Sequence, residues 1–442
     1  MRRTLQDHRA AVRELLAGHL AGDGVRPLER LPLAEALGRV AAADVAAPAP
    51  LPSFDNSQMD GFAVSTADLG AGGPLLVAAP VPAGAAAAPW QPGTAVPVMT
   101  GAMIPAGADA VVPVEAADPP RFPDPLDGAA RVVLPVVPAG QFIRRSGSDL
   151  AAAAVAVRAG TRLTPALLGL LSATGAATVE VLAGLRVLLL STGDEVVAAG
   201  RPLGPGKIYD ANSVMLAALL REAGVMVHTA ELIPDRPARF LELLAGELAA
   251  MAGRGTPAHL VLSTGGISAG AYEVVKQALA GEGVEFVSVA MQPGGPQAIG
   301  SVQGIPFLGF PGNPVSCAVS YEMFLHPVLA ELAGARPRLR TTAALAAVLT
   351  SPAGKVQLRR GRYRFGGGGD YDDGGGGGGG GDDDRAGPGT PAPGTPGRGT
   401  VEPVGGSSSH LLSSLAAANA LIVIPAEVTE VPAGADVEVW LL

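Results

Sequence analysis

The pattern of apolar and polar positions changes along the chain, and these changes predict several domains. Near the N-terminus, apolar residues recur at helical spacing at Val12, Leu15, Leu16 and Leu20. Glycines interrupt this pattern at 22–24, and we expect residues 1 to about 46 to be helical. From Pro48 to about Ile143 short apolar runs lie between prolines and glycines, which is typical of a small, mainly β domain.

Between residues 185 and 332 the pattern alternates between strands and helices. Thr164 followed by Pro165 predicts the start of a helix that leads into this region, and Gly175 predicts its end. The expected strands are 187–190, 225–231, 260–262, 284–289 and 306–310, and the expected helices are 214–223, 238–252, 273–279 and 315–332. This alternation indicates a central three-layer α/β sandwich with a mostly parallel sheet.

Strand-like runs return after Arg336, at 343–349, 356–358, 421–424 and 437–442, and they predict a C-terminal β-barrel or sandwich. A Gly/Asp-rich insert at 366–400, with eight consecutive glycines at 374–381, interrupts them. Such a segment cannot bury enough apolar surface to fold, so we expect it to be disordered. The chain is thus a multidomain α/β plus β protein. Its expected parts are an N-terminal linker or helical domain (1–46 and 147–180), a β-rich insertion domain (47–146), an α/β domain (181–334) and a C-terminal barrel (335–442).

Composition restricts the possible functions. A chain of 442 residues is too long for one ordinary core, and its net charge of -9 argues against general binding of nucleic acid. Since only Lys207, Lys276 and Lys355 are lysines, arginines must supply most of the positive charge.

The single cysteine, Cys317, excludes an internal disulfide and a thiolate-rich metal site, and its apolar neighbours predict a buried thiol. The charged N-terminus does not resemble a secretion signal, and no apolar run is long enough for a membrane helix. We therefore expect a cytoplasmic protein with no membrane partner.

A glycine-rich loop follows the strand expected at 260–262 and has the composition of an anion-binding loop. In VLSTGGISAG, residues 261–270, glycines would let backbone N–H groups approach a phosphate, while Ser263 and Thr264 add hydroxyl donors. The other interpretation is an ordinary turn. LLLSTGDE at 188–195 ends in the same way, and both loops are expected to face one crevice beyond the carboxyl ends of the strands.

Four further polar segments are candidates for chemistry, and each has a structural alternative. FDNSQMDGFA at 54–63 gathers acidic residues but could be a side-chain-stabilised turn, and MTGAMIPAGADAVV at 99–112 could be an ordinary hairpin. The arginine pair in QFIRRSGSDL at 141–150 could be a solvated face. Asp194 and Glu195 in STGDEV, followed by GKIYDANS at 206–213, could hold a divalent cation against a phosphate or cap a helix.

In this order, these segments closely resemble one family, the molybdopterin molybdenumtransferases, which are bacterial relatives of the gephyrin E domain. The resemblance extends through IRRSGSD, FPGNPVS and SSSHLLSSLAAANALIVIP, and so covers nearly the whole chain. It implies an enzyme of molybdenum cofactor biosynthesis that inserts molybdate into adenylated molybdopterin and releases AMP. It also implies a homodimer whose active site combines the α/β domain of one subunit with the β domain of the other.

The resemblance assigns roles to matching residues. The implied catalytic residues are Asp60, Thr100, Glu195, Asp235 and Glu273, of which Glu195 and Asp235 would hold Mg²⁺. The implied substrate-binding residues are Arg144, Asp149, Ser263, Thr264, Gly265, Gly266, Ser268, Gly270, Lys276, Gln292, Pro311, Gly312, Asn313, Pro314, Arg360 and Ser409. Arg360 and Ser409 would help to hold molybdate, and the glycine-rich loop and the Asn313 region would bind the pterin phosphate or the nucleotide.

The chain departs from the family pattern at an anion-binding segment. SVAMQPGGPQ places Ser288, Gln292 and Gly295 where the family usually has lysines, and Glu273 replaces a shorter aspartate. Losing these charges weakens oxyanion binding unless other groups replace them. Arg359 or Arg360 could supply the missing charge. The N–H groups of the glycine-rich loop, together with Lys276 and Arg360, would then carry more of the anion binding than in other family members.

Two other functions remain open from the sequence alone. One is the adenylyltransferase that precedes the transferase, whose single α/β domain resembles residues 185–333. The other is a noncatalytic carrier or scaffold for the pterin cofactor. The upstream adenylyltransferase and the downstream molybdoenzymes are also expected partners.

Overall fold

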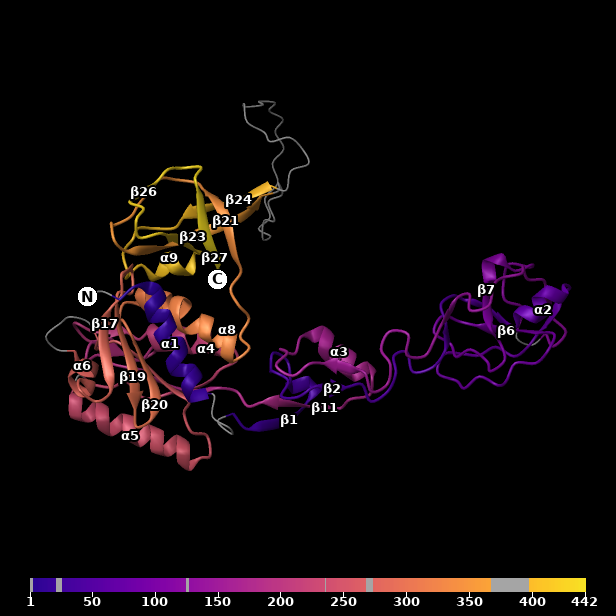
Figure 1. Cartoon of the computed structure of the whole chain (residues 1–442), viewed down its shortest axis with the longest axis horizontal. Helices are drawn as coiled ribbons and strands as arrows, with labels where there is room; N and C mark the ends of the chain where they lie inside the picture. The colour runs from indigo at the N-terminus through magenta and orange to yellow at the C-terminus, as the bar shows by residue number, and fades with distance from the viewer. Residues whose placement is uncertain (1–2, 21–25, 125–126, 235, 268–272, 367–396) are drawn as a thin grey trace, which may run out of the picture. The chain divides into compact units, whose positions relative to one another are not determined.

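The computed structural model describes residues 3–20, 26–124, 127–234, 236–267, 273–366 and 397–442. Its contacts define two compact units, Met1–Pro27 with Ala183–Leu442 (unit 1) and Leu28–Leu182 (unit 2) (Figure 1). Three residues with predicted roles, Asp235, Ser268 and Gly270, lie outside the described residues, as does most of the Gly/Asp-rich insert.

A six-stranded sheet forms the centre of unit 1, in the order β15-β12-β16-β20-β19-β17. Its strands are β12 (Arg186–Ser191), β15 (Met226–Thr229), β16 (Leu260–Thr264), β17 (Val284–Ser288), β19 (Pro296–Val302) and β20 (Ile305–Phe310). The first four in this order are parallel, while β19 runs antiparallel to both of its neighbours. The prediction of a mostly parallel sheet is confirmed, although β19 was missed because its residues mix polar and apolar types.

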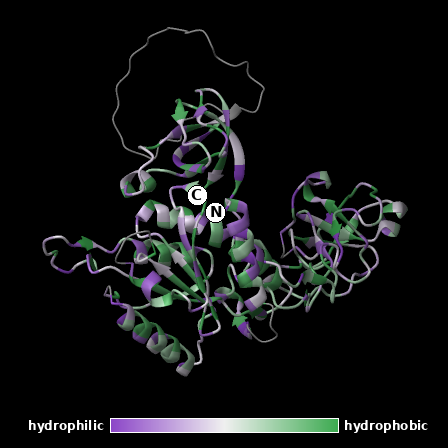
Figure 2. Ribbon diagram, turned by 60° about the vertical axis from the view of Figure 1, so that its left-hand side comes forward, coloured by the Kyte–Doolittle hydropathy of each residue, from purple (hydrophilic) through white to green (hydrophobic). Residues whose placement is uncertain are grey.

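Helices cover both faces of this sheet, as predicted for a three-layer sandwich. On one face, α5 (Pro237–Gly253) and α6 (Val274–Leu279) pack on residues such as Leu188, Val261 and Phe307. The other face carries α1 (Leu5–Leu20), α4 (Asn212–Glu222), α7 (Pro314–Ser320) and α8 (His326–Leu332), packed on Leu189, Leu262 and Leu308. In Figure 2 the long helix α5, at the bottom of the view, carries both hydrophobic and hydrophilic residues, as a helix with one buried face does.

The segment predicted as one helix at 315–332 is interrupted by a π-helical turn, η3 (Tyr321–Leu325), between α7 and α8. Pro327 explains part of this change because it has no N–H to donate to the carbonyl of Met323, four residues earlier. The Met323 carbonyl oxygen instead accepts a hydrogen bond from Arg9 Nε of α1 at 2.9 Å. The irregular turn therefore helps to attach the N-terminal helix.

A closed barrel of five strands forms the C-terminal part of unit 1, in agreement with the predicted barrel. Its strands are β21 (Arg340–Leu345), β23 (Val356–Gly366), β24 (Gly397–Pro403), β25 (Ala420–Ile424) and β27 (Asp436–Leu441). The short strand β18 (Met291–Gln292) pairs with β23, and β22 (Leu349–Thr350) pairs with β26 (Glu430–Val431). Helix α9 (Leu412–Ala416) precedes β25. In the α/β region, β13 (Val196–Val197) pairs with β14 (Ile208–Tyr209). The predicted insert of 366–400 was too long, because residues at both of its ends continue β23 and β24 in antiparallel pairing.

The prediction that residues 1–46 are helical is correct for α1 and wrong beyond it. Residues 28–46 contain β1 (Leu28–Pro32), the 3-10 turn η1 (Leu33–Glu35) and β2 (Val45–Ala46), because they pair with strands far along the chain. Helix α1 also belongs to unit 1, where Val12 and Leu16 lie in its core. The predicted domain division had grouped α1 with residues 147–180, but these residues belong to unit 2.

Unit 2 is rich in short strands, as predicted. A five-stranded sheet, β7-β4-β6-β5-β8, is built from β4 (Gly61–Val64), β5 (Leu75–Val77), β6 (Thr94–Val98), β7 (Ala110–Pro113) and β8 (Arg131–Val132). Unit 2 also contains β3 (Asn56–Ser57), β9 (Ile143–Arg144), β10 (Val155–Val157), β11 (Thr178–Leu182), η2 (Val114–Ala116), α2 (Thr66–Ala71) and α3 (Pro165–Ala173). Thr164 caps α3, since its hydroxyl accepts the N–H of Leu167 at 3.3 Å.

No helix in the described part of the chain has the length and apolar character needed to span a membrane.

Two buried histidines of unit 1 predict a loss of stability in mild acid. Burial lowers the pKa of His8 to about 4, helped by the charge of Arg3, and burial also lowers the pKa of His326 to about 4. Between pH of about 6.5 and 4 the unfolded chain therefore binds protons that the folded chain does not. The contribution of these two residues to the free energy of unfolding is complete above pH 6.5 and decreases as the pH falls towards 4.

A His8→Leu variant should show a smaller decrease over this range than the parent chain. Each unit holds one of the two tryptophans, Trp90 in unit 2 and Trp440 in unit 1, so a Trp90→Phe background lets fluorescence follow urea unfolding of unit 1 alone. If the free energy of unfolding fell equally with pH in the parent and in the His8→Leu variant, the prediction would be contradicted.

Candidate functional site

A polar cavity of about 570 Å³ lies beyond the carboxyl ends of β12, β16 and β20, and we call it cavity A. The parallel register aligns Ser191 of β12 with Thr264 of β16, and Thr264 with Phe310 of β20, so the loops after these strands emerge together. Its lining is Ser191, Thr192, Gly193, Glu195, Val196, Ile208, Tyr209, Asp210, Ala211, Asn212, Thr264, Gly265, Gly266, Glu273, Gly312, Asn313, Pro314 and His410. The expectation that the two Ser-Thr-Gly loops face one crevice is confirmed.

The glycine-rich loop is shaped by close packing as well as by its place on cavity A. Gly265 and Gly266 have φ values of +88° and +66°, and a Cβ on Gly265 would lie 2.8 Å from the carbonyl oxygen of Thr192. The Gly265 N–H donates to the carbonyl of Phe310 at 3.0 Å, so it is already used within the protein. Ser263 is fully buried and is not among the described residues that line the cavity.

Asn212, the first residue of α4, ties the cavity loops together. Its amide nitrogen donates to Thr264 Oγ1 at 2.9 Å and to the carbonyl of Gly312 at 2.7 Å. Its carbonyl oxygen Oδ1 and Thr192 Oγ1 are buried, and neither has a hydrogen-bond partner in the described structure. Both residues line cavity A, so a bound ligand or water can supply these partners.

The lone cysteine lies directly behind this wall. The Cys317 thiol is 3.4 Å from Thr264 Oγ1, and complete burial raises the pKa of Cys317 to about 12. The prediction of a buried thiol is confirmed.

Three carboxylates line cavity A: Glu195, Asp210 and Glu273. Within the described ranges, no three His, Cys, Asp or Glu side chains are grouped closely enough to enclose a metal ion. Mg²⁺ usually takes only one or two protein carboxylates together with water and substrate phosphates. The donor set therefore fits a magnesium ion shared with a phosphate ligand.

A second cavity of about 570 Å³, cavity B, adjoins the same Asn313 loop. It is lined by Ser288, Val289, Met291, Gln292, Pro293, Gly294, Gly295, Pro296, Pro311, Asn313, Ser316, Lys355, Ser407, Ser408 and Ser409. Hydroxyl groups are frequent, and carboxylates are absent from these described lining residues. The sequence had marked Gln292, Pro311, Asn313 and Ser409 as substrate-binding residues, and the structure brings them together here.

Arg360 and Lys276 are placed differently from expectation. Arg360 is only 2% exposed and lines neither cavity; its guanidinium donates to the carbonyl of Ser408 at 3.0 Å and to that of Gly406. It therefore holds the loop that carries Ser407–Ser409. Lys276 is exposed on α6 and also lines neither cavity.

Unit 2 brings together the segments that contain Asp60, Thr100 and Arg144. The Asp60 carboxylate accepts the Thr100 N–H at 2.6 Å and the Thr100 hydroxyl at 2.9 Å, and these hydrogen bonds lower the pKa of Asp60. Backbone hydrogen bonds join the neighbouring segments, from Gly101 to Ser57 and from Gln58 to Phe142.

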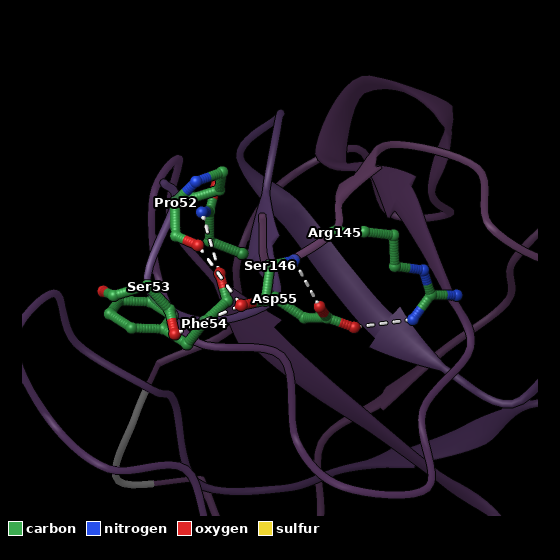
Figure 3. A network of polar contacts seen from close by, with 7 residues as sticks. Pro52, Ser53, Phe54, Asp55, Arg145 and Ser146 are labelled. Carbon is green, nitrogen blue, oxygen red and sulfur yellow. Dashed lines mark hydrogen bonds and ion pairs between the residues drawn. The ribbon is translucent and has the colours of Figure 1, made fainter. Parts of the chain in front are cut away.

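The adjacent arginines of unit 2 have different partners. Arg145 forms an ion pair with Asp55 at 2.6 Å, and Asp55 also accepts the N–H of Ser146 at 2.7 Å (Figure 3). Arg144 and Asp149 are exposed and make no side-chain hydrogen bond or ion pair with the described residues. Arg145 therefore stabilises its loop, while Arg144 and Asp149 remain accessible to a ligand.

Comparisons with known proteins cover the chain from end to end. Family models described as "MoeA N-terminal region (domain I and II)", "Probable molybdopterin binding domain" and "MoeA C-terminal region (domain IV)" match residues 3–175, 188–331 and 394–442. Molybdopterin molybdenumtransferase 2 of Mycobacterium tuberculosis is 41% identical, covering 99% of this chain and 99% of that protein. The chain belongs to the molybdopterin molybdenumtransferase family.

Other members of the molybdopterin molybdenumtransferase family agree with this assignment. The enzyme of Haemophilus influenzae is 34% identical over 93% of each chain. A crystal structure of the molybdopterin biosynthesis moeA protein of Pyrococcus horikoshii OT3 matches with a TM-score of 0.73 and 25% identity over 100% of each chain. The chain is thus an enzyme of molybdenum cofactor biosynthesis.

Sequence reasoning assigned no role to several residues that line the cavities of this family member, among them Asp210, Asn212, Lys355 and His410. Asp210 and Asn212 stand in the IYDANS segment, whose density of hydrogen-bonding side chains was a usable signal. Lys355 and His410 reach the cavities from the barrel, and no local pattern shows which loops of the barrel approach the α/β domain.

A Gly265→Ala variant should unfold more easily than the parent, by about 1–3 kcal/mol, because the new Cβ would meet the Thr192 carbonyl at a positive φ. Gly246→Ala is the matched control: Gly246 lies inside α5 with open space at its Cβ position, so alanine there should be neutral or stabilising. Urea unfolding of unit 1 measures both, and equal stability of the two variants would contradict the packing argument.

Thr100→Val should raise the pKa of Asp60 towards its ordinary value, because the hydroxyl hydrogen bond is lost while the backbone one remains. Thr100→Ser keeps the donor and should leave the titration unchanged. NMR titration of the Asp60 carboxyl carbon measures the change, and no difference between the two variants would contradict this role of the hydroxyl.

Proposed function

We propose that this enzyme inserts molybdate into adenylated molybdopterin and releases AMP. The observation that carries the proposal is the pair of neighbouring cavities, one rich in carboxylates and one rich in hydroxyls, that share Asn313. The names of the relatives support molybdopterin and molybdenum as the reacting partners.

Cavity A suits the phosphate and nucleotide part of this ligand. Gly265, Gly266 and Asn313 are close to the carboxyl ends of the strands, where ligands of parallel sheets commonly bind. The unpartnered Asn212 Oδ1 can accept hydrogen bonds from a ligand hydroxyl or amine.

Mg²⁺ is the metal that we propose for cavity A, held by Glu195, with Glu273 nearby and Asp235 added by the family resemblance. When bound, it would supply neutralisation of phosphate charge. Glu195 and Glu273 line the cavity together with the loops after β12 and β16, and glycine at 265 lets the second loop pack closely against Thr192 in the first. Water replaces AMP at the cleaved phosphoanhydride bond, so the reaction needs alignment more than a covalent intermediate.

Cavity B suits the oxyanion. Five of its lining residues are serines, which donate hydrogen bonds to oxygen without steric bulk: Ser288, Ser316, Ser407, Ser408 and Ser409. Arg360 keeps three of them in place by holding their loop. Since Asn313 lines both cavities, one ligand can reach from the phosphate region to the oxyanion region.

The remaining partner assignments are part of the same proposal. We expect a homodimer that receives its substrate from an upstream adenylyltransferase and delivers the cofactor to molybdoenzymes in the cytoplasm. The role of Asp60, Thr100, Arg144 and Asp149 in this reaction rests on the family resemblance, supported by the Asp60–Thr100 contact and the accessible Arg144.

Incubation of the purified chain with adenylated molybdopterin, Mg²⁺ and molybdate should release AMP and yield metal-loaded cofactor. Glu195→Gln should lower AMP release by about 10²-fold or more, since one charge that organises the phosphate is lost, and should leave molybdate binding in cavity B intact. AMP and the cofactor are measured by chromatography.

Other outcomes of this experiment separate the alternatives. Consumption of ATP with formation of the adenylate would indicate the upstream adenylyltransferase. Tight binding of the adenylate without AMP release would indicate a carrier.

A further inference from the structure

Lys355 is the only residue with a charged side chain among the described residues that line cavity B. Lys355 is half-buried and makes no hydrogen bond or ion pair with the described residues. A lysine directed to a cavity without a carboxylate partner provides an unneutralised positive charge beside the serine hydroxyls. Such a combination recognises a small oxyanion.

The fold fixes Lys355 beside the Gln292 segment. Strand β23 begins at Val356 and pairs in parallel with β18, so that Val356 aligns with Met291 and Gln357 with Gln292. The Val356 N–H also donates to the carbonyl of Ala290 at 3.0 Å. The backbone that carries Lys355 is thereby attached to the Gln292 segment, which also lines the cavity.

The other cations considered for this role are engaged or placed elsewhere. Arg360 lines neither cavity and donates from Nη1 and Nη2 to the carbonyls of Ser408 and Gly406, and Arg359, which also lines neither cavity, donates to the carbonyl of Gly405 at 3.3 Å. Lys276 lies on α6 and does not line cavity B. Ser288, Gln292 and Gly295 line the cavity but carry no charge.

We propose that Lys355 is the charged group that binds the oxyanion in cavity B, in place of a cation at Gln292. The inference rests on the proposed function, in which this oxyanion is molybdate. Lys355 then contributes charge from the barrel side of the cavity, and Gln292 contributes a neutral amide from the α/β side.

Calorimetric titration of sodium molybdate into the full-length chain tests this assignment. Lys355→Met should bind molybdate roughly tenfold to a hundredfold more weakly, as expected for the loss of one hydrogen bond to a charged group. Lys355→Arg keeps the charge and should stay within a few-fold of the parent. Arg254→Met, at the exposed end of α5 outside both cavities, removes one positive charge as a matched control and should have no effect.

The double variant Lys355→Met with Gln292→Lys decides whether charge in the cavity is what matters. Moving the ammonium group to the neighbouring segment, which lines the same cavity, should restore most of the lost affinity. Unchanged binding in Lys355→Met, or a loss that neither Lys355→Arg nor Gln292→Lys relieves, would overturn the proposal, as would a parent chain that binds no molybdate. A parent chain that binds molybdate through Lys355 but releases no AMP would overturn the proposed function alone.

Discussion

The parallel register of β12, β16 and β20 is the constraint on which cavity A depends. It places Ser191, Thr264 and Phe310 side by side, and the three loops that follow must therefore share one edge of the sheet. Crowded loops need small residues and fixed hydrogen bonds. Gly265 meets the first need because a Cβ would contact Thr192, and Asn212 meets the second because its amide joins Thr264 to Gly312.

The barrel contributes the other side of the site through one loop and one strand. Arg360 is buried and holds the Gly406–Ser408 backbone, while β23 is attached to β18 next to Gln292. An arginine that holds a loop by its carbonyl groups cannot at the same time offer those N–H groups to a ligand. The buried Arg360 of β23 therefore has a different role from the half-buried Lys355, which immediately precedes that strand.

Much of this architecture could be predicted from local patterns. Apolar strands such as β12 and β16, and the Thr164–Pro165 helix start, carry strong signals because burial and capping depend on neighbouring residues. The strands β1 and β19 could not be recognised in this way, since distant partners stabilise them and their own residues are mixed. The residues of the candidate site show the same contrast between local patterns, which the sequence displays, and distant contacts, which it does not. The sequence identified the loops at the sheet edge and, through the family resemblance, Asp60 and Thr100. It could not show that Arg360 holds a backbone loop, which depends on contacts within the barrel, or that Lys355 lines a cavity, which depends on how the barrel meets the α/β domain.

The inaccessible cysteine behind Thr264 has a consequence for the selectivity of metal transfer. Thiolates compete strongly for metals that prefer sulfur, and a thiol becomes a ligand only when it loses its proton. Cys317 is kept protonated by burial, and it is the only cysteine in the sequence. The polypeptide therefore offers no thiolate to the incoming metal, and the only sulfur among the described lining residues of the two cavities is the thioether of Met291.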